Sequence, residues 1–190
     1  NYYYRDLRDQ LSSSITPSIT YDTVNHPFKP TTGTKIGFSL EYGGWQFGGD
    51  RPFLRSMFEF SKFGNVDERH IFAMNTTYGY MRKLGNDPLV PYELFRPGGE
   101  NSIRGYRYGN VGSVLPDPAG RPVVVGGNKQ FIANFEYQFK IADQFRFVTF
   151  YDLGNAWAPG SKVFSEALRR SAGIEFRFFL PISPAPMRLI

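Results

Sequence analysis

The residues best suited to specific chemistry lie at positions 96–108, which read R-P-G-G-E-N-S-I-R-G-Y-R-Y. Arg104 offers a planar guanidinium that binds carboxylates through two hydrogen bonds and keeps its charge at any working pH. Gly98, Gly99 and Gly105 surround it, and glycine adopts backbone conformations that other residues resist. This pattern predicts a structured loop that delivers the cation of Arg104 to a defined place.

The sequence offers no pattern for catalysis, a metal or a cofactor. It contains no cysteine, which excludes disulfide frameworks, cysteine nucleophiles and cysteine-liganded zinc. It has neither a G-x-S-x-G nor a H-E-x-x-H motif, and its carboxylates form no recognisable acid–base pair. His26 and His70 are interpreted as surface or interface residues. We therefore expect no catalytic, cofactor-binding or metal-binding residues, and no enzyme activity.

The composition favours a β-protein. Aromatic residues make up 17% of the chain, with 19 Phe and 12 Tyr. The mean hydropathy is nevertheless −0.36, and no apolar run approaches the ~18–20 residues of a transmembrane helix. The net charge of +5 comes from basic residues scattered through the chain, without a Lys/Arg block, so nucleic acid is not an expected partner.

Alternating apolar and polar side chains predict about seven strands and the start of another. Their ranges are 14–22, 34–42, 53–62, 70–81, 131–139, 145–153, 168–180 and 187–190. Most are about 9–12 residues long, the span of a tilted membrane strand, whereas strands of soluble proteins average about 5–6. The expected fold class is all-β, an antiparallel transmembrane β-barrel. A soluble β-sandwich stays open as an alternative, because it would expose the same polar face to water.

Side chains alternate between the two faces of a strand, so each face of the predicted barrel can be assigned. The residues expected to face lipid are Phe131, Phe135, Phe139, Phe145, Phe147, Ile174, Phe176 and Phe178. The residues expected to face the lumen are Asn134, Glu136, Gln138, Asp152, Glu175 and Arg177. Aromatic residues near strand ends fit the interfacial girdles of such barrels: Tyr42, Trp45, Tyr78, Tyr80, Tyr151 and Trp157.

The predicted strands are interrupted at about residues 84–127, the segment that carries Arg104. Long segments without secondary structure are usually functional or disordered. Within it, residues 115–121 contain two prolines, a glycine and few apolar anchors, which predicts a mobile segment. Residues 25–33 and 43–52 have the composition of turns.

Five motifs in order resemble a known family. They are D-T-V-N-H-P-F-K-P-T-T-G-T-K (22–35), G-G-E-N-S-I-R-G-Y (98–106), F-E-Y-Q-F (135–139), F-Y-D-L-G-N-A-W (150–157) and S-A-G-I-E-F-R-F-F-L-P-I-S-P-A-P-M-R (171–188). Together they resemble the C-terminal barrel of the BamA/TamA-type outer-membrane assembly and polypeptide-transport family. That family also includes two-partner secretion pores and the organellar Sam and Toc channel proteins.

The resemblance implies a sixteen-stranded barrel whose sixth extracellular loop folds back into the lumen. The loop would present Arg104, Gly105 and Tyr106 to the inner-wall acids Glu136 and Asp152. The early strands, the last strand and the family's POTRA repeats are absent from these residues. We therefore expect residues 1–190 to form a partial transmembrane barrel domain with an inward-folded loop at about 84–127, as a fragment or as a barrel completed by other chains.

The function implied by the resemblance is assembly of the outer membrane. The protein would insert β-barrel proteins or translocate polypeptides without chemical catalysis. Its partners would be the lipid bilayer, unfolded outer-membrane or secreted polypeptides and accessory subunits, and its location the outer membrane of a Gram-negative-type bacterium or an organelle of bacterial origin. A passive porin, a soluble β-barrel or sandwich binding domain and an outer-membrane enzyme are the alternatives. The sequence does not separate insertion from secretion.

Overall fold

The computed structural model describes residues 13–44, 52–85, 93–117, 119–180 and 186–190. Most of the predicted turn at 43–52, including Trp45, and part of the predicted interruption, residues 86–92, lie outside the described residues. Within these ranges the secondary structure consists of strands. No described helix has the length and apolar character needed to cross a membrane.

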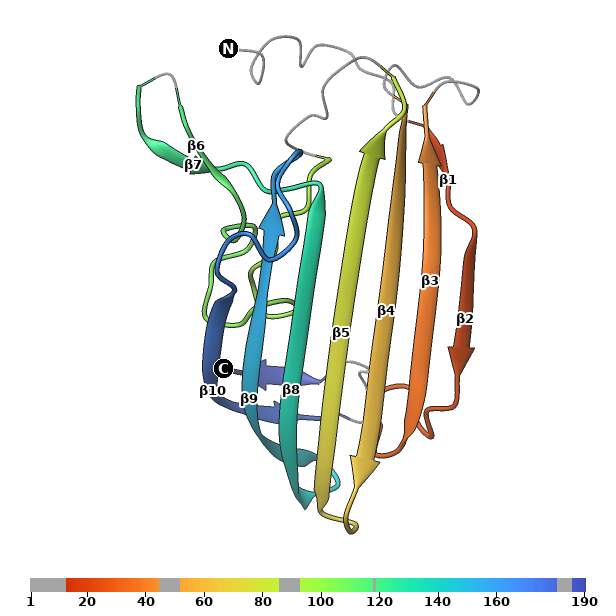
Figure 1. The fold of residues 1–190 in the computed structure, drawn as a ribbon. Coiled ribbons are helices and arrows are strands. Elements are labelled where there is room, and N and C mark those ends of the chain that lie inside the picture. Colours follow the sequence, from red (N-terminus) through yellow and green to blue (C-terminus); the bar gives the residue numbers. More distant parts are fainter. Residues whose placement is uncertain (1–12, 45–51, 86–92, 118, 181–185) are drawn as a thin grey trace.

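Nine strands form one antiparallel sheet in the order β1-β3-β4-β5-β8-β9-β10-β11, with β2 also paired to β3 (Figure 1). A separate hairpin consists of β6 and β7. The strands are β1 (Ser14–Ile15), β2 (Ser18–Asp22), β3 (Gly33–Gly43), β4 (Phe53–Asn65), β5 (His70–Lys83), β6 (Val114–Pro116), β7 (Pro122–Val124), β8 (Lys129–Ala142), β9 (Phe145–Trp157), β10 (Arg169–Phe178) and β11 (Met187–Leu189).

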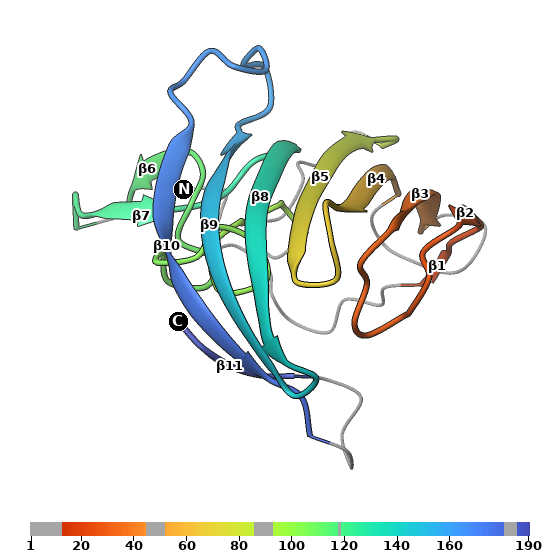
Figure 2. The same ribbon diagram turned by 90° about the horizontal axis from the view of Figure 1, so that it is seen from below.

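The sheet is curved along and across its strands, as Figure 2 shows from below. Its edges are formed by β1 and β2 on one side and by β11 on the other, and these edges do not pair within the described residues. The first predicted strand is divided into β1 and β2 around Pro17, which has no N–H to donate. The Pro17 carbonyl still accepts a hydrogen bond from Leu40 N at 3.0 Å.

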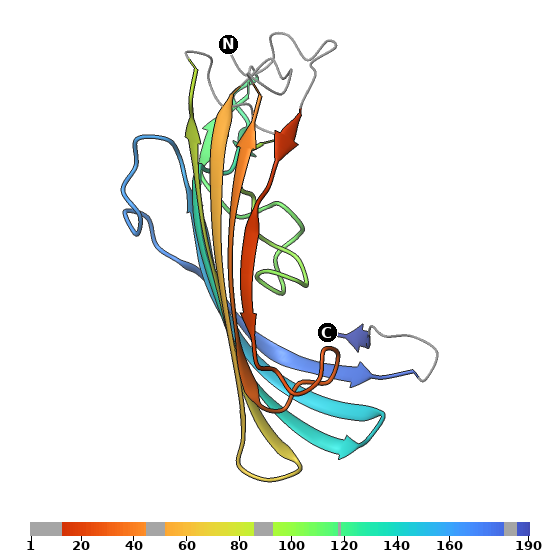
Figure 3. The ribbon, with the colours of Figure 1, turned by 90° about the vertical axis from the view of Figure 1, so that its right-hand side faces the viewer.

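The register places the predicted lumenal residues of β8, β9 and β10 on the concave face and the predicted lipid-facing residues of these strands on the convex face. Phe135 is 41% exposed and Ile174 55%, whereas Asp152 and Glu175 are fully buried. The residues predicted to face lipid are all exposed or half-buried. Figure 3 shows the green segment that follows residue 93, and the C-terminal strand β11, on the concave side. The predicted division of the strands into two faces therefore matches the structure.

Trp157 corrects the predicted aromatic girdle. It continues the outward alternation of β9, yet it is fully buried. The segment between β9 and β10 folds over it, and the ring of Phe164 packs edge-on at a centroid distance of 5.4 Å. Phe164 has a φ of 64°, a left-handed conformation that is rare for an aromatic residue. The period of a strand predicts which way a side chain points, but not which loop covers it.

The interruption contains a hairpin that was not predicted. β6 and β7 pair through Val114↔Val124, Leu115↔Val123 and Pro116↔Pro122, and the hairpin projects away from the sheet (Figure 1). The carboxylate of Asp117 accepts hydrogen bonds from the backbone N–H groups of Arg121 and Ala119, both at 2.8 Å. The hydrogen bond from Arg121 N–H is the main cause that lowers the pKa of Asp117. The mobility predicted for residues 115–121 stays a prediction.

Candidate functional site

The loop that carries Arg104 is closed by two sets of backbone hydrogen bonds. Phe95 and Gly127 bond each other, N to O, at 2.8 and 2.9 Å. Further in, Val111 N donates to Pro97 O at 2.9 Å. These pairs bring the two arms of the loop together on the concave face, so residues 97–111 form a compact lobe rather than a flexible connection.

Glycines make the turns inside this lobe possible. Gly98, Gly99 and Gly105 have φ values of 118°, 98° and 82°, which favour glycine because a Cβ would be strained there. At Gly98 an added Cβ would also lie 2.4 Å from the carbonyl oxygen of Arg107. Gly99 N donates to Tyr106 O at 2.9 Å, which folds the intervening residues into a tip.

The tip is anchored beside Arg104 by apolar packing. Ile103 is fully buried and forms a cluster with Val111 and Ile132, against which Tyr106 packs. Asn134 Nδ2 donates to Ser102 O at 2.6 Å. Burial of the Ile103 side chain stabilises the docked loop by about 1.5–3 kcal/mol. It also holds the adjacent backbone against the concave face of the sheet.

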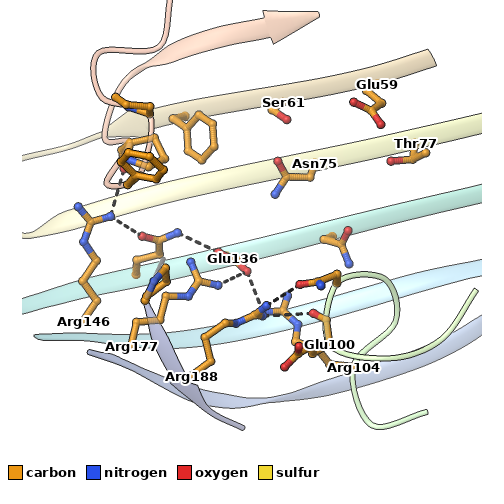
Figure 4. Close-up of a pocket in the computed structure, with 18 of the residues that line it drawn as sticks. Glu59, Ser61, Asn75, Thr77, Glu100, Arg104, Glu136, Arg146, Arg177 and Arg188 are labelled. Atoms are coloured by element: carbon orange, nitrogen blue, oxygen red, sulfur yellow. Dashed lines mark hydrogen bonds and ion pairs between the residues drawn. The ribbon is translucent and has the colours of Figure 1, made fainter. Parts of the chain in front are cut away.

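Arg104 makes five hydrogen bonds to three carboxylates, and Figure 4 shows it beside one of them, Glu136. Its backbone N and its Nε donate to Asp152 Oδ2 at 3.0 and 2.8 Å, and Nη2 donates to Asp152 Oδ1 at 2.7 Å. Nη1 donates to Glu136 Oε1 at 2.7 Å and to Glu175 Oε2 at 2.9 Å. Arg104 is 2% exposed, so water screens these ion pairs little.

Two more arginines complete the charge balance. Arg177 donates to Glu136 and Glu175, both at 2.6 Å. Arg188 donates to Glu175 at 2.7 and 2.9 Å. Glu136 and Glu175 therefore each contact at least two arginines, whereas Arg104 is the only cation in contact with Asp152 among the described residues.

The aromatic ring of Phe150 packs against one face of the Arg104 guanidinium. Arg104 Cζ lies 3.8 Å from the ring centroid, a cation–π geometry that adds to the ion pairs when both groups are desolvated. Gly173 on β10 leaves room for this ring, since an added Cβ would lie 2.7 Å from it. The G in the S-A-G-I-E-F motif is thereby explained by the packing of the site.

The structure brings together all the predicted site residues. Arg104 contacts Glu136 and Asp152, Gly105 adopts the turn conformation, and Tyr106 Oη donates to Arg170 O at 3.3 Å. The functional role of these residues stays a prediction.

Three further members of the network were not predicted as contacts of the site: Glu175, Arg177 and Arg188. For Glu175 and Arg177 the signal was present, because both fall on the predicted lumenal face.

The two histidines do not form a metal site. His26 Nδ1 accepts hydrogen bonds from the backbone of Phe28 and Lys29, and His70 Nδ1 bonds Tyr137 Oη at 2.5 Å. Across the described part of the chain, no group of three or more His, Asp or Glu side chains could hold a metal ion. The arrangement around Arg104 is suited to fixing a loop on a wall through ion pairs.

Comparison with known proteins places this architecture in a family. The Omp85 superfamily domain matches residues 1–189, and the chain belongs to this superfamily. The chain is 29% identical over 177 residues to the outer membrane protein assembly factor BamA of Nitratidesulfovibrio vulgaris. The matched region covers 92% of this chain and 22% of that protein. It is 28% identical over 102 residues to the sorting and assembly machinery component 50 homolog of Bos taurus, covering 54% of this chain and 22% of that protein.

A solved structure has the same fold. The crystal structure of BamA from Haemophilus ducreyi lacking POTRA domains 1–3 superposes with a TM-score of 0.77 at 23% sequence identity, over 92% of this chain and 37% of that chain. The chain spans about a fifth of the length of the curated relatives it matches. These findings confirm the predicted family, the all-β antiparallel fold class and the outer-membrane location.

We predict that the convex face meets lipid in such a membrane, so a charge placed on it is expected to be costly. Phe135→Arg, near the middle of β8, should destabilise the full-length protein in lipid by roughly 2–4 kcal/mol, since an arginine at the bilayer midplane loses its hydration. Urea titration of the protein folded in vesicles measures this. Phe135→Leu is the matched control, and a loss below about 0.5 kcal/mol for the arginine variant would show that this face does not contact lipid.

Proposed function

We propose that the full-length protein assembles β-barrel proteins in the outer membrane. The observation that carries this proposal is the match of the Omp85 superfamily domain to residues 1–189. It is supported by one relative named as an outer membrane protein assembly factor and another named as a sorting and assembly machinery component. The proposed partners are the lipid bilayer, unfolded outer-membrane polypeptides and accessory subunits.

In this proposal residues 1–190 belong to a partial barrel domain, and the segment at about 84–127 is its inward-folded loop. Arg104, Gly105 and Tyr106 act as the loop motif, with Glu136 and Asp152 as its inner-wall partners. Buried ion pairs hold this motif on three adjacent strands. The motif therefore sets the shape of the inner wall, and no bond of a substrate is made or broken.

Assembly itself would use the backbone of a strand edge. An unpaired edge presents N–H and C=O groups that pair with an incoming strand. Hydrogen bonds exchanged along such an edge need no cofactor or chemical step. The role of the Arg104 site would be to keep the wall in the form that supports this pairing.

The experiment is reconstitution of the full-length protein in lipid vesicles. Any accessory subunits that co-purify with it from the same cells are included. An unfolded outer-membrane β-barrel protein is added, and its folding is followed by protease resistance. We expect folding to be faster than in empty vesicles, because a templating edge lowers the barrier to strand pairing. If folding is unchanged while an unfolded secreted polypeptide crosses into the vesicles, the protein is a secretion pore and the assembly proposal is wrong.

A further inference from the structure

The turn between β2 and β3 forms a strap with its own fixed shape. The strap comprises residues 24–32, which lie within the first of the five sequence motifs. Asn25 Oδ1 accepts hydrogen bonds from Thr31 N and Thr32 N at 3.0 and 3.2 Å, and His26 Nδ1 accepts from Phe28 N and Lys29 N at 3.1 and 3.2 Å. These side-chain bonds hold the backbone of the strap in its turn conformation.

The strap reaches across the concave face to β9, to the turn between β8 and β9, and to the residue that follows β10. Arg146 Nη1 donates to Pro30 O and Arg146 Nη2 to Lys29 O, both at 3.1 Å. Lys29 Nζ donates to Asp143 O at 3.2 Å and lies 5.0 Å from the ring centroid of Phe179. The strap thus bridges strands that are far apart in the sheet, at the end opposite to the hairpin of β6 and β7 (Figures 1 and 3).

Arg146 depends on the strap for its hydrogen bonds. It is 5% exposed, and within the described residues it has no carboxylate in ion-pair contact. Its acceptors are Lys29 O, Pro30 O and Gln138 Oε1, the last at 2.9 Å. A buried cation that loses such acceptors is costly, so Arg146 and the strap stabilise each other.

Gln138 connects this contact to the Arg104 site. Its Oε1 accepts from Arg146, and its Nε2 donates to Glu136 Oε2 at 2.8 Å. Glu136 Oε1 in turn accepts from Arg104 Nη1 at 2.7 Å. The amide oxygen of Gln138 faces the guanidinium of Arg146, and its NH2 group faces the carboxylate of Glu136. A flipped amide would place its NH2 group against the guanidinium and its oxygen against the carboxylate, so both contacts would be unfavourable. Figure 4 shows this continuous row of side chains from Arg104 to Arg146 and the strap.

A cavity lies between the two ends of this row. Its volume is about 670 Å³, and its lining includes Pro27, Phe28 and Pro30 of the strap as well as Arg104 and Glu136. Movement of the strap would therefore change access to the inner wall next to the Arg104 site.

We propose that Gln138 and Arg146 are positioning residues that couple the docking of the Arg104 loop to the position of the strap. When Arg104 leaves Glu136, the orientation of Gln138 loses its support, Arg146 loses an ordered acceptor, and the strap loosens. Through this coupling, the position of the strap at one end of the concave face depends on whether the Arg104 loop, which enters from the other end, is docked. The inference goes beyond the proposed function, and its test does not use assembly activity, so each can fail separately.

The test is a distance measurement in the full-length protein in lipid. Spin labels are attached to Phe28→Cys on the strap and Glu68→Cys in the exposed turn between β4 and β5, with any cysteine elsewhere in the protein replaced by serine. Residues 1–190 contain none. We expect Arg146→Gln to displace the strap directly. Gln138→Leu, which touches neither loop nor strap backbone, should raise the displaced population about tenfold.

The decisive arm separates the two bonds of Gln138. Gln138→Glu keeps an acceptor for Arg146 but removes the donor to Glu136. Arg104→Ala should therefore displace the strap in the wild-type background and have no effect in the Gln138→Glu background. Arg55→Gln breaks the 2.7 Å ion pair with Glu41 and the 2.8 Å hydrogen bond to Glu93 O but no contact in the row of side chains from Arg104 to Arg146, so as the matched control it should leave the distances unchanged. Unchanged distances in Gln138→Leu, or an equal effect of Arg104→Ala in both backgrounds, would overturn the coupling.

Discussion

Replacing Arg104 with alanine is expected to lower the free energy of unfolding of the full-length protein by roughly 3–5 kcal/mol. The reason is electrostatic. Asp152 is fully buried, and Arg104 supplies its only ion pair among the described residues, so the variant leaves a buried charge without compensation. Glu136 and Glu175 keep Arg177 and contribute less to the loss. Urea titration in vesicles measures the change, and assembly activity should fall more than lipid binding.

Two further variants separate charge from shape at this position. Arg104→Lys should restore only part of the stability, because an ammonium is a point charge that lacks the two-pronged geometry of the guanidinium. Asp152→Asn added to Arg104→Ala should recover part of the loss, because it removes the uncompensated charge. If Arg104→Ala changes stability by less than about 0.5 kcal/mol, the ion pairs do not hold the loop in the membrane.

Gly154→Ala is expected to displace the loop while leaving every charge of the site in place. An added Cβ at Gly154 would lie 2.5 Å from Phe131 O and 3.1 Å from Ile103 Cδ1. Ile103 is buried next to Arg104 and anchors the tip of the loop. The added methyl group would therefore crowd the side chain of Ile103. Overpacking of this kind costs about 1–3 kcal/mol. Hydrogen exchange of residues 97–111 measures it, and these amides should lose protection.

Gly64→Ala is the matched control for this strand glycine. Gly64 lies in β4, and an added Cβ there would meet nothing within 4 Å. It should therefore leave hydrogen exchange of the loop unchanged. Equal protection of residues 97–111 in Gly154→Ala and wild type would mean that the loop does not dock against β9 in lipid.

The sequence by itself determined the long strands of the sheet, their two faces and the tip of the loop. Strand side chains alternate with a period of two, so the polar positions of β8 and β9 could be assigned to one face before any pairing was known. Glu136 and Asp152 were predicted there, and both are buried on the concave face. Glycine and arginine likewise predicted a structured loop, because their backbone and charge properties are local.

Only the tertiary structure decided which of these residues meet. Glu175 lies 71 positions from Arg104, and the strap lies 116 positions from Arg146, so no local pattern relates them. Trp157 shows the same limit, since its outward direction was predictable but its cover by Phe164 was not. Direction follows from the local geometry of the chain, whereas burial and ion pairing depend on strand register and on where distant loops come to rest.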